Sequence, residues 1–353
     1  MVGELTPVRV DVGSADRAFW NRFHELRRVR HHESRPEDPV QPDEEVETRI
    51  RKGNPFEVQH YYEISRDGLM LSSFYGETVS PRNAEYETNK HLFWADGYVR
   101  PDARRQGIGA LWVPVIAKLM DEHGCSVVGT ATEEESGHGF LKWLGAEQKL
   151  TEIESRLKLS EVDWPMLERW AGEGARRSPQ TKLEIYDGVL PESMLADFAP
   201  QLTSLLNTMP FESLDIGQII VTPERIKDWN ERQALVGEVQ HTVITREPDG
   251  VISGMTDITW APCRRMLIYQ QFTGVRPDAR GRGLGRWIKA AMVLHIRELY
   301  PDARWIVTEN AHSNGPMLNI NRSMGFKAYR TAVEYQMTRE QLSMRIAAQR
   351  PSP

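Results

Sequence analysis

A six-residue repeat constrains the architecture of this chain more than any other feature of its sequence. Val-Arg-Pro-Asp-Ala-Arg occurs at Val99–Arg104 and again at Val275–Arg280. The copies start at positions 99 and 275, so they lie 176 residues apart, about half of the 353-residue chain. Two glycines follow each copy at the same spacing, namely Gly107 and Gly109, then Gly283 and Gly285. The sequence therefore predicts a duplicated fold, with a period far too long for a solenoid.

The elements expected around the repeated motif follow the same order in both halves. Arg66-Asp67-Gly68 and Pro248-Asp249-Gly250 are hairpin turn signals, and each joins two β-rich segments ahead of the motif. A helix, a strand, a short helix and a closing strand are expected after it. The pattern predicts an α/β protein with domains at residues 1–160 and 181–340, a linker at 161–180 and a C-terminal tail at 341–353.

Composition and charge exclude several classes of protein. The formal net charge is −6, which argues against a broad basic face for nucleic acid. The two cysteines, Cys125 and Cys263, allow neither a disulfide framework nor a CxxC metal motif. His31 and His32 diverge on a helix and lack a third ligand, so no metal site is expected. No signal peptide or run of about 18 apolar residues is found, and a cytoplasmic location is expected.

Each copy of the repeat leads into an Arg-x-x-Gly-x-Gly motif between a strand and a helix. The two motifs are Arg104-Arg105-Gln106-Gly107-Ile108-Gly109 and Arg280-Gly281-Arg282-Gly283-Leu284-Gly285, the second followed by Arg286. Glycines allow a phosphate to approach the backbone closely, and the first N–H groups of a helix are unsatisfied donors at its positive end. A diphosphate or polyphosphate is therefore the expected ligand.

Three kinds of phosphate-binding site contain a glycine-rich loop of this type. A P-loop for nucleotides requires Gly-Lys-Ser/Thr, which neither copy contains. A dinucleotide fold requires Gly-x-Gly-x-x-Gly near the start of its sheet, whereas here several strands precede the loop. The pyrophosphate of coenzyme A is the third candidate, and a glycine-rich helix cap with solvated arginines is the alternative without a ligand.

The motifs resemble those of the GNAT acetyltransferase superfamily, whose hallmark is Arg/Gln-x-x-Gly-x-Gly/Ala between the fourth strand and the third helix. The second half is the closer match, through the segment from Thr308 to Phe326. The tandem arrangement is similar to the mycothiol synthase-like two-domain acetyltransferases of actinobacteria. The resemblance implies a duplicated GNAT fold, with a mixed, mostly antiparallel sheet flanked by helices in each half, and acetyl-CoA as the coenzyme.

The resemblance also implies roles for individual residues of the second half. The N–H groups from Gly281 to Arg286 should hold the pyrophosphate, and Asn314 should bind the coenzyme. The strand that ends at Val275 should separate from its neighbour, so that N–H groups near Thr273, Gly274 and Val275 polarise the thioester carbonyl. In the first half, Val99 and residues 104–109 occupy the corresponding positions.

The catalytic residues depart from the family pattern. The tyrosine acid of many members is replaced by Asn321 in the second half and by Leu141 in the first. Asn321 remains a candidate for hydrogen bonding the sulfur or the acceptor. Glu309, Tyr269 and His241 are the candidates for the base and the cleft, and the sequence does not decide among them.

The resulting expectation is an N-acetyltransferase that transfers an acetyl group directly to a small-molecule amine in a ternary complex. Catalysis is expected in the second half, because the short segment Glu133–Gly139 of the first half offers no counterpart of Asn314. Two alternatives stay open, a non-catalytic acyl-CoA-binding or regulatory protein and an acyltransferase with a longer acyl group or a hydroxyl acceptor. No nucleic-acid or membrane partner is expected, and both a monomer and a homodimer are compatible with the sequence.

Overall fold

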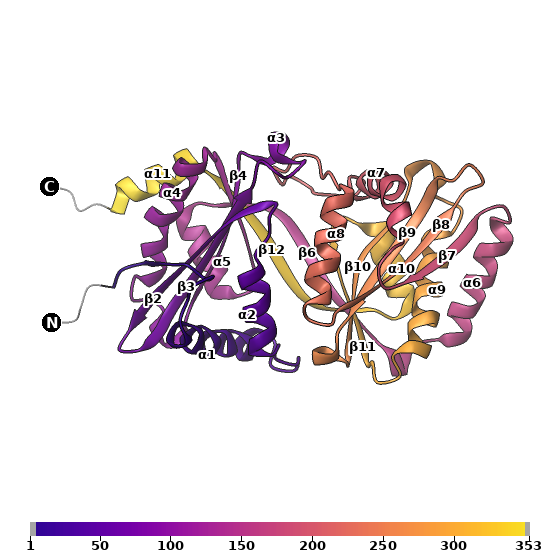
Figure 1. Cartoon of the computed structure of the whole chain (residues 1–353), viewed down its shortest axis with the longest axis horizontal. Helices are drawn as coiled ribbons and strands as arrows, with labels where there is room; N and C mark the ends of the chain where they lie inside the picture. The colour runs from indigo at the N-terminus through magenta and orange to yellow at the C-terminus, as the bar shows by residue number, and fades with distance from the viewer. Residues whose placement is uncertain (1–4, 350–353) are drawn as a thin grey trace. The chain divides into compact units, whose positions relative to one another are not determined.

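The chain divides into two units, unit 1 and unit 2 (Figure 1). The structure is a computed structural model and describes residues 5–349. Unit 1 contains the residues up to Leu150, the segment Ser213–Gln218 and the residues from Ala332 onward. Unit 2 contains Thr151–Glu212 and Ile219–Thr331. Both are α/β, and each has a mostly antiparallel sheet, so the predicted fold class and the duplication are confirmed.

Unit 1 has strands in the order β1-β2-β3-β4-β5-β12, with β4 and β5 parallel and the other neighbours antiparallel. Its elements are β1 (Val8–Val10), α1 (Arg17–Ser34), α2 (Asp43–Lys52), β2 (Glu57–Arg66), β3 (Leu69–Val79), α3 (Tyr86–Asn89), β4 (Leu92–Val99), α4 (Trp112–His123), β5 (Val127–Thr132), α5 (Glu135–Leu144), the end of β12 (Lys327–Thr338) and α11 (Arg339–Gln349).

Unit 2 repeats this order as β7-β8-β9-β10-β11-β6, with β10 and β11 as the parallel pair. Its elements are most of β6 (Glu147–Lys158), α6 (Trp164–Arg177), β7 (Lys182–Asp187), α7 (Leu195–Leu206), α8 (Pro223–Ala234), β8 (Val239–Arg246), β9 (Ile252–Trp260), β10 (Leu267–Val275), α9 (Leu284–Leu299), β11 (Trp305–Ala311), α10 (Gly315–Met324) and the start of β12.

The two halves exchange their closing strands. β6 comes from the first half of the sequence, yet it pairs along β11 of unit 2 from Glu152 to Lys158. β12 comes from the second half and pairs along β5 of unit 1 from Val333 to Thr338. The units are therefore discontinuous in sequence, whereas the predicted ranges 1–160 and 181–340 are contiguous. Sequence periodicity identifies a strand but not its partner, which accounts for the difference.

The segments expected as a linker and a tail contain helices. Residues 161–180 include α6, which Asp163 caps at the Met166 N–H and which packs along α9. Gly174 permits this close packing, because a Cβ atom there would lie 2.2 Å from Cγ of Trp287. Residues 339–349 form α11, whose Leu342 is buried in the core of unit 1.

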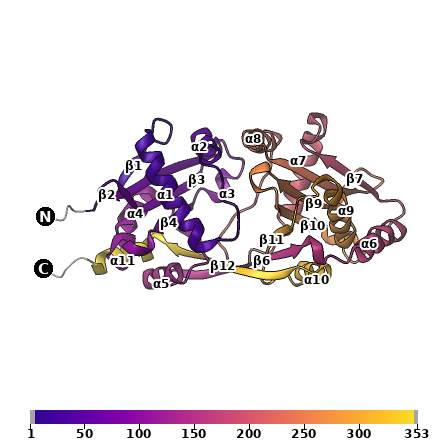
Figure 2. The same ribbon diagram turned by 90° about the horizontal axis from the view of Figure 1, so that it is seen from below.

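The two faces of the unit 2 sheet are covered by different helices (Figure 2). Val243 and Ile258 pack with α9 on one face, while Ile244 and Met255 pack with α7 and α8 on the other. This alternation follows from the two-residue period of a strand. It determines which side chains of β8, β9 and β10 can reach a ligand on each face.

Two local features show how the sequence specifies the backbone. The hairpin turn expected at Asp67 and Gly68 is present, with φ of 52° and 78°, the left-handed values that such a turn requires. The helix expected after the first glycine motif instead begins as a 3₁₀ turn over Ile108–Leu111, and α4 starts at Trp112. Pro114 explains the late start, because it has no N–H to donate to the carbonyl of Ala110.

The strand exchange predicts that neither half of the chain folds alone. A fragment of residues 1–178 lacks β12, whose Val333, Tyr335 and Met337 are buried in unit 1. Each such side chain contributes about 1.5–3 kcal/mol, and the sum is comparable to the whole stability of a domain. We expect fragments 1–178 and 179–353 to be unfolded or insoluble separately and to associate when co-expressed, with the circular dichroism of the full chain. A cooperative thermal transition from isolated 1–178 would contradict the exchange.

Candidate active site

The two glycine motifs form loops with nearly the same backbone conformation. Gly283, which precedes α9, has φ of 86°, and Gly107 in unit 1 has φ of 83°. Two positions earlier, Gly281 has φ of 80°, but its counterpart Arg105 is held at 62°. A non-glycine residue in this region costs roughly 1–2 kcal/mol. The unit 2 loop therefore adopts its conformation without the strain present in unit 1.

The unit 2 loop presents a row of backbone donors at the start of α9. The Trp287 N–H is bonded to the Gly283 carbonyl at 3.1 Å, as the first regular bond of the helix. The N–H groups of residues 281–286 lie ahead of it, at the positive end of the helix dipole. A Cβ at Gly283 would lie 3.4 Å from Nη1 of Arg177, so a larger side chain would fill the space between loop and guanidinium. This arrangement fits a diphosphate.

The arginines in and beside the unit 2 loop are of two kinds: one is held by side-chain hydrogen bonds, and the others have an exposed guanidinium. Arg282 donates to Glu247 at 2.9 Å and to Thr181 at 2.6 Å, so it fixes the loop to the start of β7. Arg280 is exposed, and within the described residues its side chain donates only through Nε, to the Val275 carbonyl at 3.3 Å. Arg286 lies over the ring of Trp170 with its charge exposed. Arg177, Arg280 and Arg286 thus leave positive charge available for a phosphate.

The corresponding charge in unit 1 is neutralised. Arg104 donates to both carboxylate oxygens of Glu33, at 2.6 and 2.7 Å. Tyr98 donates to the same carboxylate at 2.7 Å, and Arg104 holds the pKa of Glu33 below its usual value. A phosphate at this loop would have to compete with an ion pair that is already formed. Of the two loops, the one in unit 2 is therefore better suited to bind an anion.

β10 and β11 separate beside the unit 2 loop. They pair in parallel from Leu267 with Trp305 to Gln270 with Thr308, and the pairing stops there. β10 continues along β9 to Val275 after a bulge between Gln270 and Thr273. The β11 edge of the segment 271–275 thus has no partner strand among the described residues. The predicted separation at Thr273, Gly274 and Val275 is present, and it leaves peptide groups free for an extended ligand.

A buried carboxylate holds the bulge. Asp257 on β9 accepts the Phe272 N–H at 2.9 Å through Oδ1 and the Gln240 side-chain amide at 2.9 Å through Oδ2. Burial raises the pKa of Asp257 to about 6. This carboxylate is therefore fixed in position and titrates close to neutral pH, which is what a general base requires.

Asp257 lines a cavity of about 380 Å³ on the α7 and α8 face of the sheet. The wall combines polar side chains with apolar ones, and the apolar ones include Phe198, Trp229 and Phe272. The polar residues of the lining include Gln240, which donates to Asp257, and Gln271. Apolar walls with a few convergent polar groups are typical of small-molecule sites.

A second polar network lies on the opposite face of the bulge. Lys289 on α9 is fully buried, and its Nζ lies 2.5 Å from Oε1 of Gln270. Gln270 donates in turn to Thr256 at 2.8 Å, and Thr256 is bonded to Thr273. Burial lowers the pKa of Lys289 to about 7. The network fixes the last paired residue of β10, so that the strand leaves β11 at a defined point.

The predicted catalytic residues are placed apart from the cavity lining. Tyr269 on β10 is half-buried beneath the guanidinium of Arg264. Glu309 on β11 is exposed and pairs in register with Glu154. Burial raises the pKa of Glu152, and the charge of Glu309 raises it further. Neither residue lines the cavity beside Asp257, and their roles stay predictions.

The predicted asparagines have structural partners. Asn321 is buried and donates to Asn310 at 2.7 Å. Asn314 caps α10 by accepting the Met317 N–H at 3.3 Å. His241, the other candidate base, faces α9 and bonds with Asp187, on the side of the sheet away from the cavity. Cβ alternation along β8 explains its placement, because its neighbours Gln240 and Thr242 line the cavity.

The part of unit 1 that the structure describes has no counterpart of the bulge or of Asp257. β4 pairs with β3 without a shift in register, although it also separates from β5 after Trp94. Tyr75 occupies the position of Asp257 when residues are matched by their strand pairing with the repeated motif. The hydroxyl of Tyr75 donates to Glu77. The glycine loop of unit 2 therefore lies beside a bulge and a buried carboxylate, and the glycine loop of unit 1 does not.

Sequence reasoning missed Asp257 and Lys289. Asp257 is the one charged residue in the segment Ile252–Trp260, and a lone carboxylate within a buried strand is a usable signal. Lys289 falls on the apolar stripe of its helix, where a charged residue is equally unexpected. Both residues reach the bulge only because of how the strands pair, and the local sequence pattern does not reveal strand pairing.

No protein-family model and no curated protein matches the sequence. The fold has solved relatives of low identity. A tandem GNAT protein from the clavulanic acid biosynthesis pathway is 17% identical, with a TM-score of 0.74 over 95% of this chain and 99% of that one. A GCN5-related N-acetyltransferase from Sphaerobacter thermophilus is 15% identical, with a TM-score of 0.62 over 95% and 96%.

A third similar structure is a glucosamine N-acetyltransferase region of a fungal multi-domain β-N-acetylglucosaminidase. It is 10% identical, with a TM-score of 0.65 over 95% of this chain and 38% of that one. Within residues 5–349, no helix combines the length and apolar character needed to cross a membrane. With its two copies of strand, glycine loop and helix, the chain has the fold of the tandem GNAT proteins.

Proposed function

We propose that this protein is an acyl-CoA-dependent N-acetyltransferase whose working site lies in unit 2. One observation supports the proposal above the others. The bulge that separates β10 from β11 is held by Asp257, a buried carboxylate that also lines an adjacent cavity. A place for the coenzyme arm and a place for an acceptor therefore meet at one residue.

The unit 2 loop would hold the coenzyme. The N–H groups of residues 281–286 would bind the pyrophosphate, with Arg280 and Arg286 supplying charge. Acetyl-CoA would supply the activated acyl group as a thioester. The unpaired edge of residues 271–275 would bind the extended arm, and its N–H groups would stabilise negative charge on the carbonyl oxygen.

The cavity beside Asp257 would hold the acceptor. An ammonium group must lose a proton before its nitrogen can attack, and Asp257 is positioned to take that proton. The apolar wall formed by Phe198, Trp229 and Phe272 favours a small amine with a hydrophobic body. Asn321 lacks the acidity of a phenol, so protonation of the leaving sulfur falls to solvent.

A second candidate is a protein that binds acyl-CoA without turnover. The buried Asn321 at the position of the usual tyrosine favours it. The buried Asp257 in the cavity favours the enzyme instead, because a binding protein has no need of a base at that place. Thiol release from acetyl-CoA across a panel of apolar amines separates the two candidates.

Gly283→Asp should abolish stabilisation of the protein by acetyl-CoA, because bulk and negative charge would then occupy the loop. Saturating acetyl-CoA should stabilise the wild type, by about 2.7 kcal/mol at a hundredfold excess over Kd. Gly107→Asp is the matched control, since both glycines have nearly equal φ and suffer equal strain. Thermal unfolding with and without acetyl-CoA measures the effect. Loss of the shift in Gly107→Asp, and not in Gly283→Asp, would place the coenzyme in unit 1.

Asp257→Asn should lower kcat/KM by about 10²–10⁴-fold, the usual contribution of a general base. The Gln240 amide can rotate to bond the new side chain, so the fold should be kept. In the wild type, kcat/KM should fall as the pH drops below about 6, where the carboxylate takes up its proton. The measurement is a pH profile of thiol release.

Gln240→Leu distinguishes a base from a merely structural carboxylate. The hydrogen bond from Gln240 lowers the pKa of Asp257, so its loss should move the acidic limb of the profile to higher pH. An acidic limb that stays in place in Gln240→Leu, or a full rate in Asp257→Asn, would contradict the role given to Asp257.

A further inference from the structure

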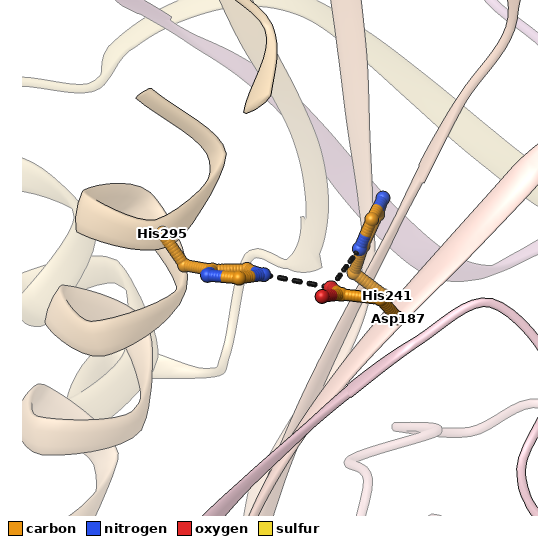
Figure 3. Close-up of side chains that lie close together, drawn as sticks. All are labelled: Asp187, His241 and His295. Atoms are coloured by element: carbon orange, nitrogen blue, oxygen red, sulfur yellow. Dashed lines mark hydrogen bonds and ion pairs between the residues drawn. The ribbon is translucent and has the colours of Figure 1, made fainter. Parts of the chain in front are cut away.

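A cluster of two histidines and one aspartate lies outside the proposed active site, on the α9 face of unit 2. Asp187 ends β7, His241 lies on β8 and His295 on α9, and Figure 3 shows both rings directed at the carboxylate. Oδ1 of Asp187 lies 2.6 Å from Nδ1 of His241 and 2.7 Å from Nε2 of His295. All three ligand atoms lie within 4.8 Å of one another.

We propose that Asp187, His241 and His295 form a Zn²⁺ site that fastens β7 and β8 to α9. Two imidazole nitrogens and one carboxylate oxygen are a ligand set that zinc accepts, with a fourth position left for water. Tetrahedral bonds of about 2.0–2.1 Å place the ligand atoms about 3.3 Å apart. The carboxylate oxygen therefore needs to move away from each of the two nitrogens by less than about 1 Å, and Asp187, which is half exposed, is free to make that movement.

The surroundings of the cluster support a metal site. His241 is buried, and its second nitrogen, Nε2, lies 2.5 Å from the hydroxyl of Tyr300. Tyr300 is itself fixed by stacking on Trp260 at 4.4 Å. A bond from the outer nitrogen of a ligating histidine orients the ring and selects its tautomer. His295 also lies near the C-terminal end of α9, where the helix dipole favours a cation.

The matching corner of unit 1 shows that the fold does not itself require this cluster. His60 occupies the position in the unit 1 sheet that His241 occupies in unit 2. Each histidine pairs with a residue of the next strand, and that residue lies four positions beyond the one that pairs with the first residue of the repeat. His60 is bonded to His123 at 2.8 Å, but its other nitrogen faces the guanidinium of Arg9 at 3.3 Å. Burial lowers the pKa of His60 to about 4, and the charges of His123 and Arg9 add to this effect. A cation is repelled there, whereas unit 2 provides a carboxylate.

The expectation from sequence was that the chain has no metal site, because no local spacing of ligands suggested one. The three residues stand at positions 187, 241 and 295, and only the folded sheet brings them together. The role proposed for the ion is to fasten β7 and β8 to α9 and not to act on the acceptor. His241 points away from the cavity that its neighbours Gln240 and Thr242 line, so the ion would not touch the acceptor.

The test is zinc titration of the full chain, tag-free and stripped with a chelator, followed by calorimetry and by thermal unfolding. We expect one Zn²⁺ per chain and a rise in Tm. His295→Ala and Asp187→Asn should each weaken binding by more than about 100-fold, and Tyr300→Phe by about 10–100-fold. His123→Ala in unit 1 is the matched control and should leave both affinity and stoichiometry unchanged.

Two results would overturn the proposal. One is the absence of saturable zinc binding by the stripped wild type, which would leave the cluster as an ion-pair clasp only. The other is wild-type zinc affinity in His295→Ala or Asp187→Asn. Because Asp187 is half exposed, Asp187→Asn should stay folded even if His295→Ala does not, and circular dichroism verifies this.

Discussion

The interruption of the β10–β11 pairing is the constraint on which the proposed site depends. A continuous parallel pair would satisfy its own peptide groups and leave none for a ligand. Here the pairing ends at Gln270 and Thr308, and buried side chains fix that end on both faces of the sheet. Asp257 accepts the N–H of the bulged Phe272 on one face, and Lys289 holds Gln270 on the other. Both charged groups are costly to bury, which argues that their positions matter beyond packing.

Duplication has given the two units one backbone plan and different chemistry. Their glycine loops agree closely in φ, yet Arg104 is already paired with Glu33 while Arg280 is exposed. The position of Asp257 is a tyrosine in unit 1, and β4 lacks the bulge. The exchange of β6 and β12 means that each half contributes a strand to the sheet of the other. Unit 1 can therefore be indispensable for folding while its own loop takes no part in binding.

The sequence allowed the duplication, the α/β class and the glycine loops to be predicted, because each depends on residues close together in the chain. The hairpin at Asp67 and Gly68 and the helix after Gly283 are of this kind. The exchange of closing strands was not predicted, since strand partners are chosen by long-range packing. For the same reason Asp257 and Lys289 escaped notice, and His241 was considered a base although alternation along β8 directs it to the other face.

Of the two glycine loops, we expect the one before α9 alone to bind a diphosphate. Isothermal titration of the wild-type chain with acetyl-CoA is the decisive experiment, because it counts the sites. We expect saturable heat with one acetyl-CoA bound per chain, and a marked loss of affinity at raised salt, since charge and backbone dipoles provide the attraction. A stoichiometry of two, or no binding at all, would rule out a single coenzyme site at this loop.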